Sequence, residues 1–190
     1  MKLYEYVLKP FSPFGTTLRG DTLFGHFCWQ CRYDGTLLEG GFEHWIKQYP
    51  QKPFAVFSSV CFRLEKGAMR YAVKRPDVPL EWLFSSEGKS KREIFEERKK
   101  NAARRWLLLA ENLSMTFSEK NLVNNDGLFK QMFPDWEKSD VPLSMKQEID
   151  VNYLQAHNTV NRETMTTGEG MFAPYNVSAT WFFPETRLAL

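Results

Sequence analysis

Residues 14–29 read FGTTLRGDTLFGHFCW. They include the point at which a loop ends and a helix begins, and this point decides the first part of the fold. Prolines end the strand that precedes this stretch, because proline cannot donate to a β-ladder. Asp21 stands where an N-cap belongs, and apolar residues follow it at helical spacing. The pattern predicts a helix over residues 22–33 that ends at Gly35. Gly25 lies inside this helix, which indicates that another group approaches the backbone closely there.

Strands are expected on both sides of this helix. Residues 2–9 (KLYEYVLK) alternate as a strand does, and we expect that strand to be fairly central in its sheet. Residues 54–64 and 69–74 flank a turn at residues 65–68 and predict a β-hairpin. The order strand, helix, hairpin is the opening of a split βαβ unit.

The rest of the chain has weaker patterns. Residues 89–113 predict one long helix, and residues 114–154 predict an insertion with short helical pieces. We therefore expect a single domain over residues 1–190, in which residues 85–155 form a partly helical insertion. Residues 177–183 (VSATWFF) predict the last strand, with its aromatic residues in the core. Residues 186–190 form a β-like run that stops, which favours an N-terminal part of a longer protein whose final strand is an exposed edge.

The composition restricts the class of protein. The 190 residues are 43% hydrophobic, which is enough for a core, and the net charge of +2 excludes a highly basic protein. Three cysteines without a signal peptide indicate reduced thiols in the cytoplasm. Cys28 and Cys31 have C-x-x-C spacing, but no second pair follows, so we expect neither a metal nor another cofactor. No apolar run approaches the roughly 18 residues that a membrane helix needs.

The loop over residues 12–21 is a candidate phosphate site. In a βα unit such a loop lies beside the N-terminus of the helix, where the partial positive charge favours anions. The alternative is a capped turn in which Asp21 only satisfies helix amides. The expected donors are the side chains of Thr16, Thr17 and Arg19 and the backbone amides of Gly15 and Gly20.

Three further features each have two interpretations. His26, one turn into the helix, could serve as general acid or base in metal-independent RNA cleavage. Local packing is the better interpretation, because the sequence places no second base beside it. Residues 158–170 combine hydroxyls, glycines and an arginine, which suit sugar and phosphate contacts, but they also suit an ordinary surface loop. Residues 98–105 (RKKNAARR) could contact nucleic acid, although interleaved acids favour a solvated helix face.

Two stretches carry a family resemblance. Residues 11–29 (FSPFGTTLRGDTLFGHFCW) resemble the N-terminal signature of the RAMP subunit that caps the 5′ end of CRISPR RNA in type III-A (Csm) effector complexes, the subunit 4 family. Residues 157–183 (HNTVNRETMTTGEGMFAPYNVSATWFF) are similar to that family's second signature, in which an N-x-x-N-R run precedes a T-G-E turn. The two matches stand in the expected order.

The resemblance implies a fold, a function and partners. The fold would be α+β, ferredoxin-like (RRM-like, βαββαβ), of the group-5 RAMP class, and this chain would be the N-terminal half of a two-domain protein. The function would be non-catalytic binding of the CRISPR RNA 5′ handle in antiviral defence. Its partners would be the large polymerase-like subunit, the backbone RAMP subunit and, indirectly, target RNA. An alternative within the same superfamily is a metal-independent endoribonuclease that processes CRISPR precursor RNA with His26.

The resemblance also implies which residues contact RNA. They are Phe14, Gly15, Thr16, Thr17, Arg19, Gly20, Asp21, Thr22 and His26 in the first stretch, and Asn158, Asn161, Arg162, Thr164, Thr167, Gly168 and Gly170 in the second.

Overall fold

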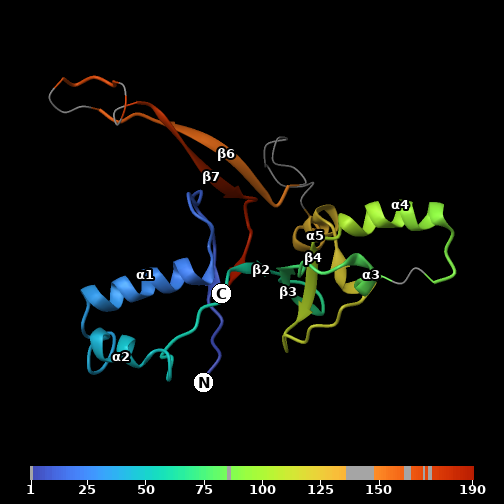
Figure 1. Ribbon diagram of the computed structural model, residues 1–190, viewed down its shortest axis with the longest axis horizontal. Coiled ribbons are helices and arrows are strands. Elements are labelled where there is room, and N and C mark those ends of the chain that lie inside the picture. The colour runs from blue at the N-terminus through green and yellow to red at the C-terminus, as the bar shows by residue number, and fades with distance from the viewer. Residues whose placement is uncertain (1, 85–86, 136–147, 161–163, 169, 171–172) are drawn as a thin grey trace. The chain divides into compact units, whose positions relative to one another are not determined.

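The computed structural model describes residues 2–84, 87–135, 148–160, 164–168, 170 and 173–190 (Figure 1). Within these ranges the protein is a mixed α and β structure with five α-helices and antiparallel strand pairs, in agreement with the expected α+β class. The chain forms two compact units, which we call unit 1 (residues 1–6, 16–60 and 190) and unit 2 (residues 7–15 and 61–189). No helix in the described ranges is long and apolar enough to cross a membrane.

Unit 1 is built on helix α1 (Gly20–Tyr33), which confirms the helix predicted over residues 22–33. The capping differs from the prediction. Arg19 is the N-cap residue and has an extended backbone, whereas Asp21 lies in the first turn and accepts a 2.7 Å hydrogen bond from the amide of Thr22. The Gly20 amide donates instead to Ser59 Oγ at 3.1 Å, so the chain 39 residues later satisfies this helix end.

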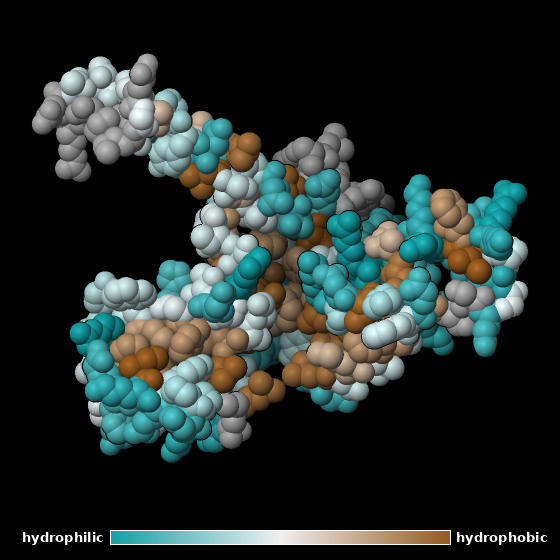
Figure 2. All heavy atoms as spheres, in the orientation of Figure 1, coloured by the Kyte–Doolittle hydropathy of each residue, from teal (hydrophilic) through white to brown (hydrophobic). Residues whose placement is uncertain are grey.

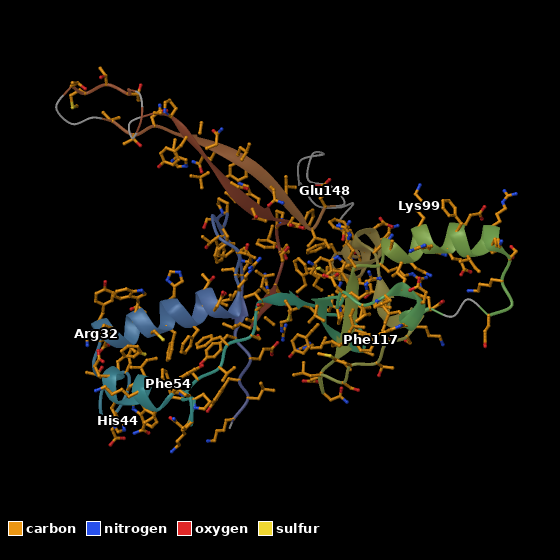
Figure 3. The ribbon with its side chains drawn as sticks, in the orientation of Figure 1. Arg32, His44, Phe54, Lys99, Phe117 and Glu148 are labelled. Carbon is orange, nitrogen blue, oxygen red and sulfur yellow. The ribbon has the colours of Figure 1, made fainter. Side chains whose placement is uncertain are left out.

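Aromatic side chains hold unit 1 together. Phe24 and Phe27 on α1 pack against Tyr49, Phe54 and Phe57, with ring centroids 4.9 Å apart for Phe24–Tyr49 and 5.3 Å apart for Phe27–Phe57. Tyr49 follows the short helix α2 (Phe42–Gln48) and donates from its hydroxyl to the carbonyl of residue 55 at 2.8 Å. Figure 2 shows hydrophobic atoms gathered beside α1, and Figure 3 shows Phe54 close to α1 and α2.

Unit 2 contains a six-stranded sheet in the order β1-β8-β2-β3-β4-β5. Phe62 pairs with Ala72, which confirms the predicted hairpin of β2 and β3, and Gly67 takes a φ of +91° in its turn. The core on one side contains buried Phe84, Leu107, Leu109 and Leu122. The strands are β1 (Val7–Leu8), β2 (Cys61–Arg63), β3 (Met69–Lys74), β4 (Trp106–Ala110), β5 (Leu122–Val123) and β8 (Leu188–Ala189).

The positions of β1 and β8 in this sheet order correct two predictions. The strand expected to be central is β1, which is only two residues long and lies at the edge, with Tyr4 and Tyr6 before it 64% and 62% exposed. The run expected to be an exposed edge is β8, which pairs with β1 on one side and β2 on the other. Leu188 and Ala189 are buried, and this burial explains why β8 occupies an interior position.

The long helix predicted over residues 89–113 is also wrong. Helix α4 (Lys91–Ala102) begins at a capping box of Ser90 and Glu93 and ends before strand β4. Three consecutive leucines in β4, residues 107–109, are each at most 3% exposed. Successive residues of a strand point to opposite faces of the sheet, so β4 is buried on both faces, and a continuous apolar run suits such a strand as well as it suits a helix.

The segment expected to be an insertion contributes to the core. The short helical pieces predicted there are η1 (Glu119–Asn121) and α5 (Asn125–Met132), and α5 buries Leu128 and Phe129 completely. Phe129 packs against Phe133 and Phe183 with ring centroids 5.1 and 5.0 Å apart. The remaining short helix is α3 (Leu80–Leu83), which contacts α4.

A second sheet consists of β6 (Asp150–His157) and β7 (Tyr175–Phe182). The two strands pair over eight residues each, from Asp150–Phe182 at one end to His157–Tyr175 at the other, and run side by side as a ribbon in Figure 1. Strand β7 confirms the strand predicted over residues 177–183, whereas β6 lies in the segment for which only helical pieces were predicted. Phe182 packs on Phe62, so the ribbon's base belongs to the core of unit 2.

Candidate nucleic-acid interface

The start of the first candidate stretch lies against strand β7. Phe14 and Thr180 exchange both backbone hydrogen bonds, with N–O distances of 3.0 and 2.9 Å. The ring of Phe14 also packs edge-on against Phe182 at 5.9 Å between centroids. A Cβ atom added to Gly15 would lie 4.0 Å from Val177 Cγ1, in ordinary van der Waals contact. The structure thus places the start of the first candidate stretch against β7, the strand that follows the second stretch.

The polar residues after Gly15 belong to unit 1 and are exposed. Thr16, Thr17 and Arg19 all keep exposed side chains, and the Arg19 guanidinium forms no ion pair with any described residue. The backbone of Arg19 is fixed by a 2.9 Å bond from its amide to the Thr17 carbonyl. Arg19 can therefore offer a free positive charge beside the first turn of α1.

The remaining groups of this stretch are less available to a phosphate. The Gly20 amide already donates to Ser59, so a phosphate that used this amide would have to displace the serine hydroxyl. Asp21 places a carboxylate in the same turn, and this carboxylate accepts from both the amide and the hydroxyl of Thr22 at 2.7 and 3.4 Å. Anion binding here would depend on Arg19 and the threonine hydroxyls more than on a cradle of amides.

His26 is exposed on α1, six residues after Gly20. Within the part of the chain that the structure describes, its imidazole has neither a hydrogen bond nor an ion pair. A general base in nucleophilic cleavage is oriented by a partner group, and no described side chain does this for His26.

The second candidate stretch follows β6 at the far end of the ribbon. Asn158 is exposed directly after the last strand pair, and Thr164, Thr167, Gly168 and Gly170 are exposed further along. Thr164 and Thr166 share a hydrogen bond of 2.9 Å between their hydroxyls, and Gly170 has a φ of +63°, which favours glycine. Asn161 and Arg162 lie outside the described residues.

The start of the first stretch lies on one flank of the ribbon, away from the end that leads to the second stretch. Phe14 pairs with Thr180, five residues along β7 from the last strand pair at Tyr175. At about 3.4 Å per residue this separation is roughly 17 Å. Gly15 lies nearer to that end, because Val177 is only two residues, or about 7 Å, from Tyr175.

Sequence reasoning missed an aromatic face of the ribbon. His157 stacks on Tyr175 at 5.5 Å between centroids, and Tyr153 stacks on Trp181 at 6.5 Å. The strand register puts all four rings on the same face. Trp181 was expected in the core but is 41% exposed, whereas Phe183 is buried as expected. The alternation of residues 151, 153, 155 and 157 could have indicated this face, because strand residues two apart point the same way.

The described residues of this interface show no arrangement suited to metal or thiol chemistry. Among the described residues, no group of three or more histidine, cysteine or acidic side chains could hold a metal ion. Cys31 is buried on α1, and burial raises the pKa of the Cys28 and Cys31 thiols above their ordinary value. Raised pKa values keep these thiols protonated and poorly nucleophilic near neutral pH.

Comparison of the sequence with models of known protein families and with curated proteins found no match.

Proposed function

We propose that this protein is an RNA-binding subunit of a type III CRISPR effector complex that holds the 5′ handle of CRISPR RNA. The observation that carries the proposal is the reciprocal pair of backbone bonds between Phe14 and Thr180. These bonds join the two stretches that resemble the RAMP signatures, although the stretches lie near opposite ends of the sequence.

The chemistry of the exposed groups supports the same function. Arg19 has a free charge, the ribbon's far end carries threonine hydroxyls, and the aromatic face offers rings for base stacking. Phosphate contacts of this kind position a nucleic acid without reading its sequence, and exposed aromatic rings stack on bases of any kind. We therefore propose that most of the affinity comes from the RNA backbone and falls as the salt concentration rises.

The proposal takes its fold family and partners from the resemblance. The helix followed by a β-hairpin supports a ferredoxin-like ancestry, whereas the edge position of β1 departs from the central place expected of the first strand. In the effector complex the protein would dock the large polymerase-like subunit and the backbone RAMP subunit. It would meet target RNA only through the guide.

The first test measures retention of a 5′-labelled repeat RNA by the purified chain in EDTA. Arg19→Ala should weaken binding and reduce the slope of log K against log salt by about 0.7, the value for one phosphate contact with a single strand. Arg32→Ala is the matched control, because Arg32 lies at the other end of α1 and is paired with Glu43 at 2.8 Å. Equal effects of the two substitutions, or none from Arg19→Ala, would contradict the proposed site.

The same samples test the nuclease alternative. A handle-binding subunit should retain the RNA intact, since EDTA removes metal-dependent contaminants. A discrete cut that disappears in His26→Ala, with retention unchanged, would replace the proposal with metal-independent RNA processing.

A further inference from the structure

The outer face of helix α4 combines an exposed aromatic ring with positive charges. Phe95 is 76% exposed, and Lys91 and Lys99 stand one helical turn before and after it. Arg98 lies three residues after Phe95 on the same side and is also exposed. Figure 3 shows Lys99 projecting outward from α4. We call Lys91, Phe95, Arg98 and Lys99 the α4 face.

The acidic residues of α4 do not neutralise this face, because each is engaged close by. Glu93 completes the capping box with Ser90, and Glu96 pairs with Arg92 at 3.1 Å. Glu97 pairs with Lys89, just before the helix, at 2.6 Å, and this bond raises the pKa of the lysine. Among the described residues, the three cations of the α4 face have no ion-pair partner. The basic residues are exposed, as expected of a solvated helix face, but the interleaved acids are bonded to groups other than these three cations.

Phe95 is not the residue that attaches α4 to the protein. A small pocket of about 70 Å³ lies where α3 meets α4, and the α4 side chains that line it are those of Ile94, Glu97, Arg98 and Asn101. Arg98 therefore borders both this pocket and the α4 face. The one strongly buried residue of the helix is Asn101, at 7% exposure. Phe95 is not among the residues that line this pocket, and its side chain is 76% exposed. Its position is explained if a ligand covers it.

We propose that the α4 face binds single-stranded nucleic acid, with one base stacked on Phe95 and the flanking phosphates held by Lys91, Arg98 and Lys99. The helix rise places Lys91 and Lys99 about 12 Å apart, with Phe95 midway. Cations that track a backbone on both sides of an aromatic ring are the arrangement by which proteins hold single strands without reading their sequence. This site lies outside both candidate stretches and does not depend on the proposed handle binding.

Other anionic ligands use fewer of these groups. A peptide that bound through its carboxylates would engage the cations but leave the Phe95 ring in water. A duplex keeps its bases stacked inside, so its phosphates would meet the lysines while the phenylalanine stayed in water. A membrane-surface helix needs a continuous apolar face, and α4 exposes a single large apolar residue.

The test uses the full chain and a fluorescent oligouridine of twelve nucleotides, with binding followed by fluorescence anisotropy at several salt concentrations. Phe95→Ala should weaken binding about 5- to 150-fold, the usual cost of losing one stacked base, and leave the salt slope unchanged. Phe95→Trp should retain the affinity. Lys91→Ala with Lys99→Ala should lower the salt slope by about 1.4, or 0.7 for each phosphate contact.

Lys100→Ala is the matched control for charge. Lys100 is exposed and forms no ion pair with a described residue, but it points about 140° around the helix from Phe95, five residues later. It should alter oligouridine binding less than Lys99→Ala alone. Equal effects of the two lysine substitutions, or wild-type affinity in Phe95→Ala, would overturn the proposal.

Two further measurements separate this site from the alternatives. Polyglutamate that displaces oligouridine equally well from wild type and Phe95→Ala would identify a peptide-binding surface and refute stacking. Arg19→Ala should leave the effect of Phe95→Ala on oligouridine binding intact. One further outcome separates the two proposals: Arg19→Ala weakens the binding of repeat RNA, but Phe95→Ala leaves the affinity for oligouridine unchanged. That result would refute the α4 site and leave the handle-binding proposal intact.

Discussion

Replacing Gly20 by alanine should destabilise unit 1, because the first turn of α1 packs directly on backbone. An added Cβ would lie 2.5 Å from the carbonyl oxygen of Phe57 and 3.1 Å from the carbonyl carbon of Ser58. Real Cβ atoms essentially never come within 3.0 Å of another group, and backbone cannot rotate away as a side chain can. The helix or the 57–59 segment must shift, and the hydrogen bond from the Gly20 amide to Ser59 shifts with it.

The expected cost is about 1–3 kcal/mol, the usual range for forcing extra volume into a packed site. Hydrogen exchange of α1 peptides, followed by mass spectrometry, measures this locally in the whole chain. Amides that exchange through opening of α1 should exchange about 5- to 150-fold faster in Gly20→Ala, since 1.4 kcal/mol is a factor of ten. Peptides of β3 and β4 in unit 2 serve as the internal reference.

Gly25→Ala is the matched control, with the same change in the same helix. A Cβ at Gly25 would meet nothing within 4 Å, so the substitution adds helix propensity without a clash. Alanine is favoured over glycine by about 1 kcal/mol inside a helix, so exchange of α1 should slow by about fivefold. Exchange that is unchanged in Gly20→Ala, or that changes in the same direction in both variants, would refute the account of α1 packing.

Three other substitutions test the rest of the structure. Phe129→Ala should cost about 3–5 kcal/mol in urea unfolding because the ring is fully buried, whereas Phe117→Ala, at a position 46% exposed and labelled in Figure 3, should cost far less. Ser90→Ala should remove the capping box and speed exchange of α4 amides about fivefold, for a loss near 1 kcal/mol, with β4 amides unchanged. Asp150→Asn should raise the Tm at pH 7 and leave it nearly unchanged at pH 3. Desolvation first, and then the like charge of Glu148, raise the pKa of Asp150. The stability from the protonated form is thus present below its ordinary pKa and lost as pH rises through the folded value. A lower Tm at pH 7 would contradict this reasoning.

The elements that sequence predicted correctly are those with local signals. Helix α1 follows from apolar spacing, and the β2–β3 hairpin from a glycine-containing turn between two β-rich runs. Strand β7 follows from a short aromatic and β-branched run. None of these depends on which distant segment becomes the neighbour.

The errors come from non-local pairing. The apolar run at residues 106–110 fits a helix or a buried strand, and only its neighbours β3 and β5 decide between them. The edge position of β1 depends on β8, and burial of Phe129 depends on Phe183, far along the chain. Short strands and helices with few apolar residues have too weak a hydrophobic pattern to indicate which distant segments they pack against.

The candidate site likewise has features that the sequence indicated and features that only the structure shows. Residue types indicated the polar loops, but only the structure shows that Ser59 occupies the Gly20 amide and that Phe14 lies on β7. The α4 face was hidden because charge counting cannot tell which acids are already bonded. Once Glu93, Glu96 and Glu97 are assigned their partners, the free cations around Phe95 become apparent.

The position of β8 has a consequence for how the protein is made. Ala189 pairs with both Val7 and Cys61, so β1 and β2 are joined only through residues near 188–189. A ribosome delivers those residues long after β1 and β2, at about 5–20 residues per second. Until then β1 and β2 each have an edge without a hydrogen-bonded neighbour. Completing the sheet requires residues 61 and 189 to come together, which closes a long loop. The nascent chain therefore spends seconds with an unfinished sheet, during which its unpaired strand edges are open to aggregation.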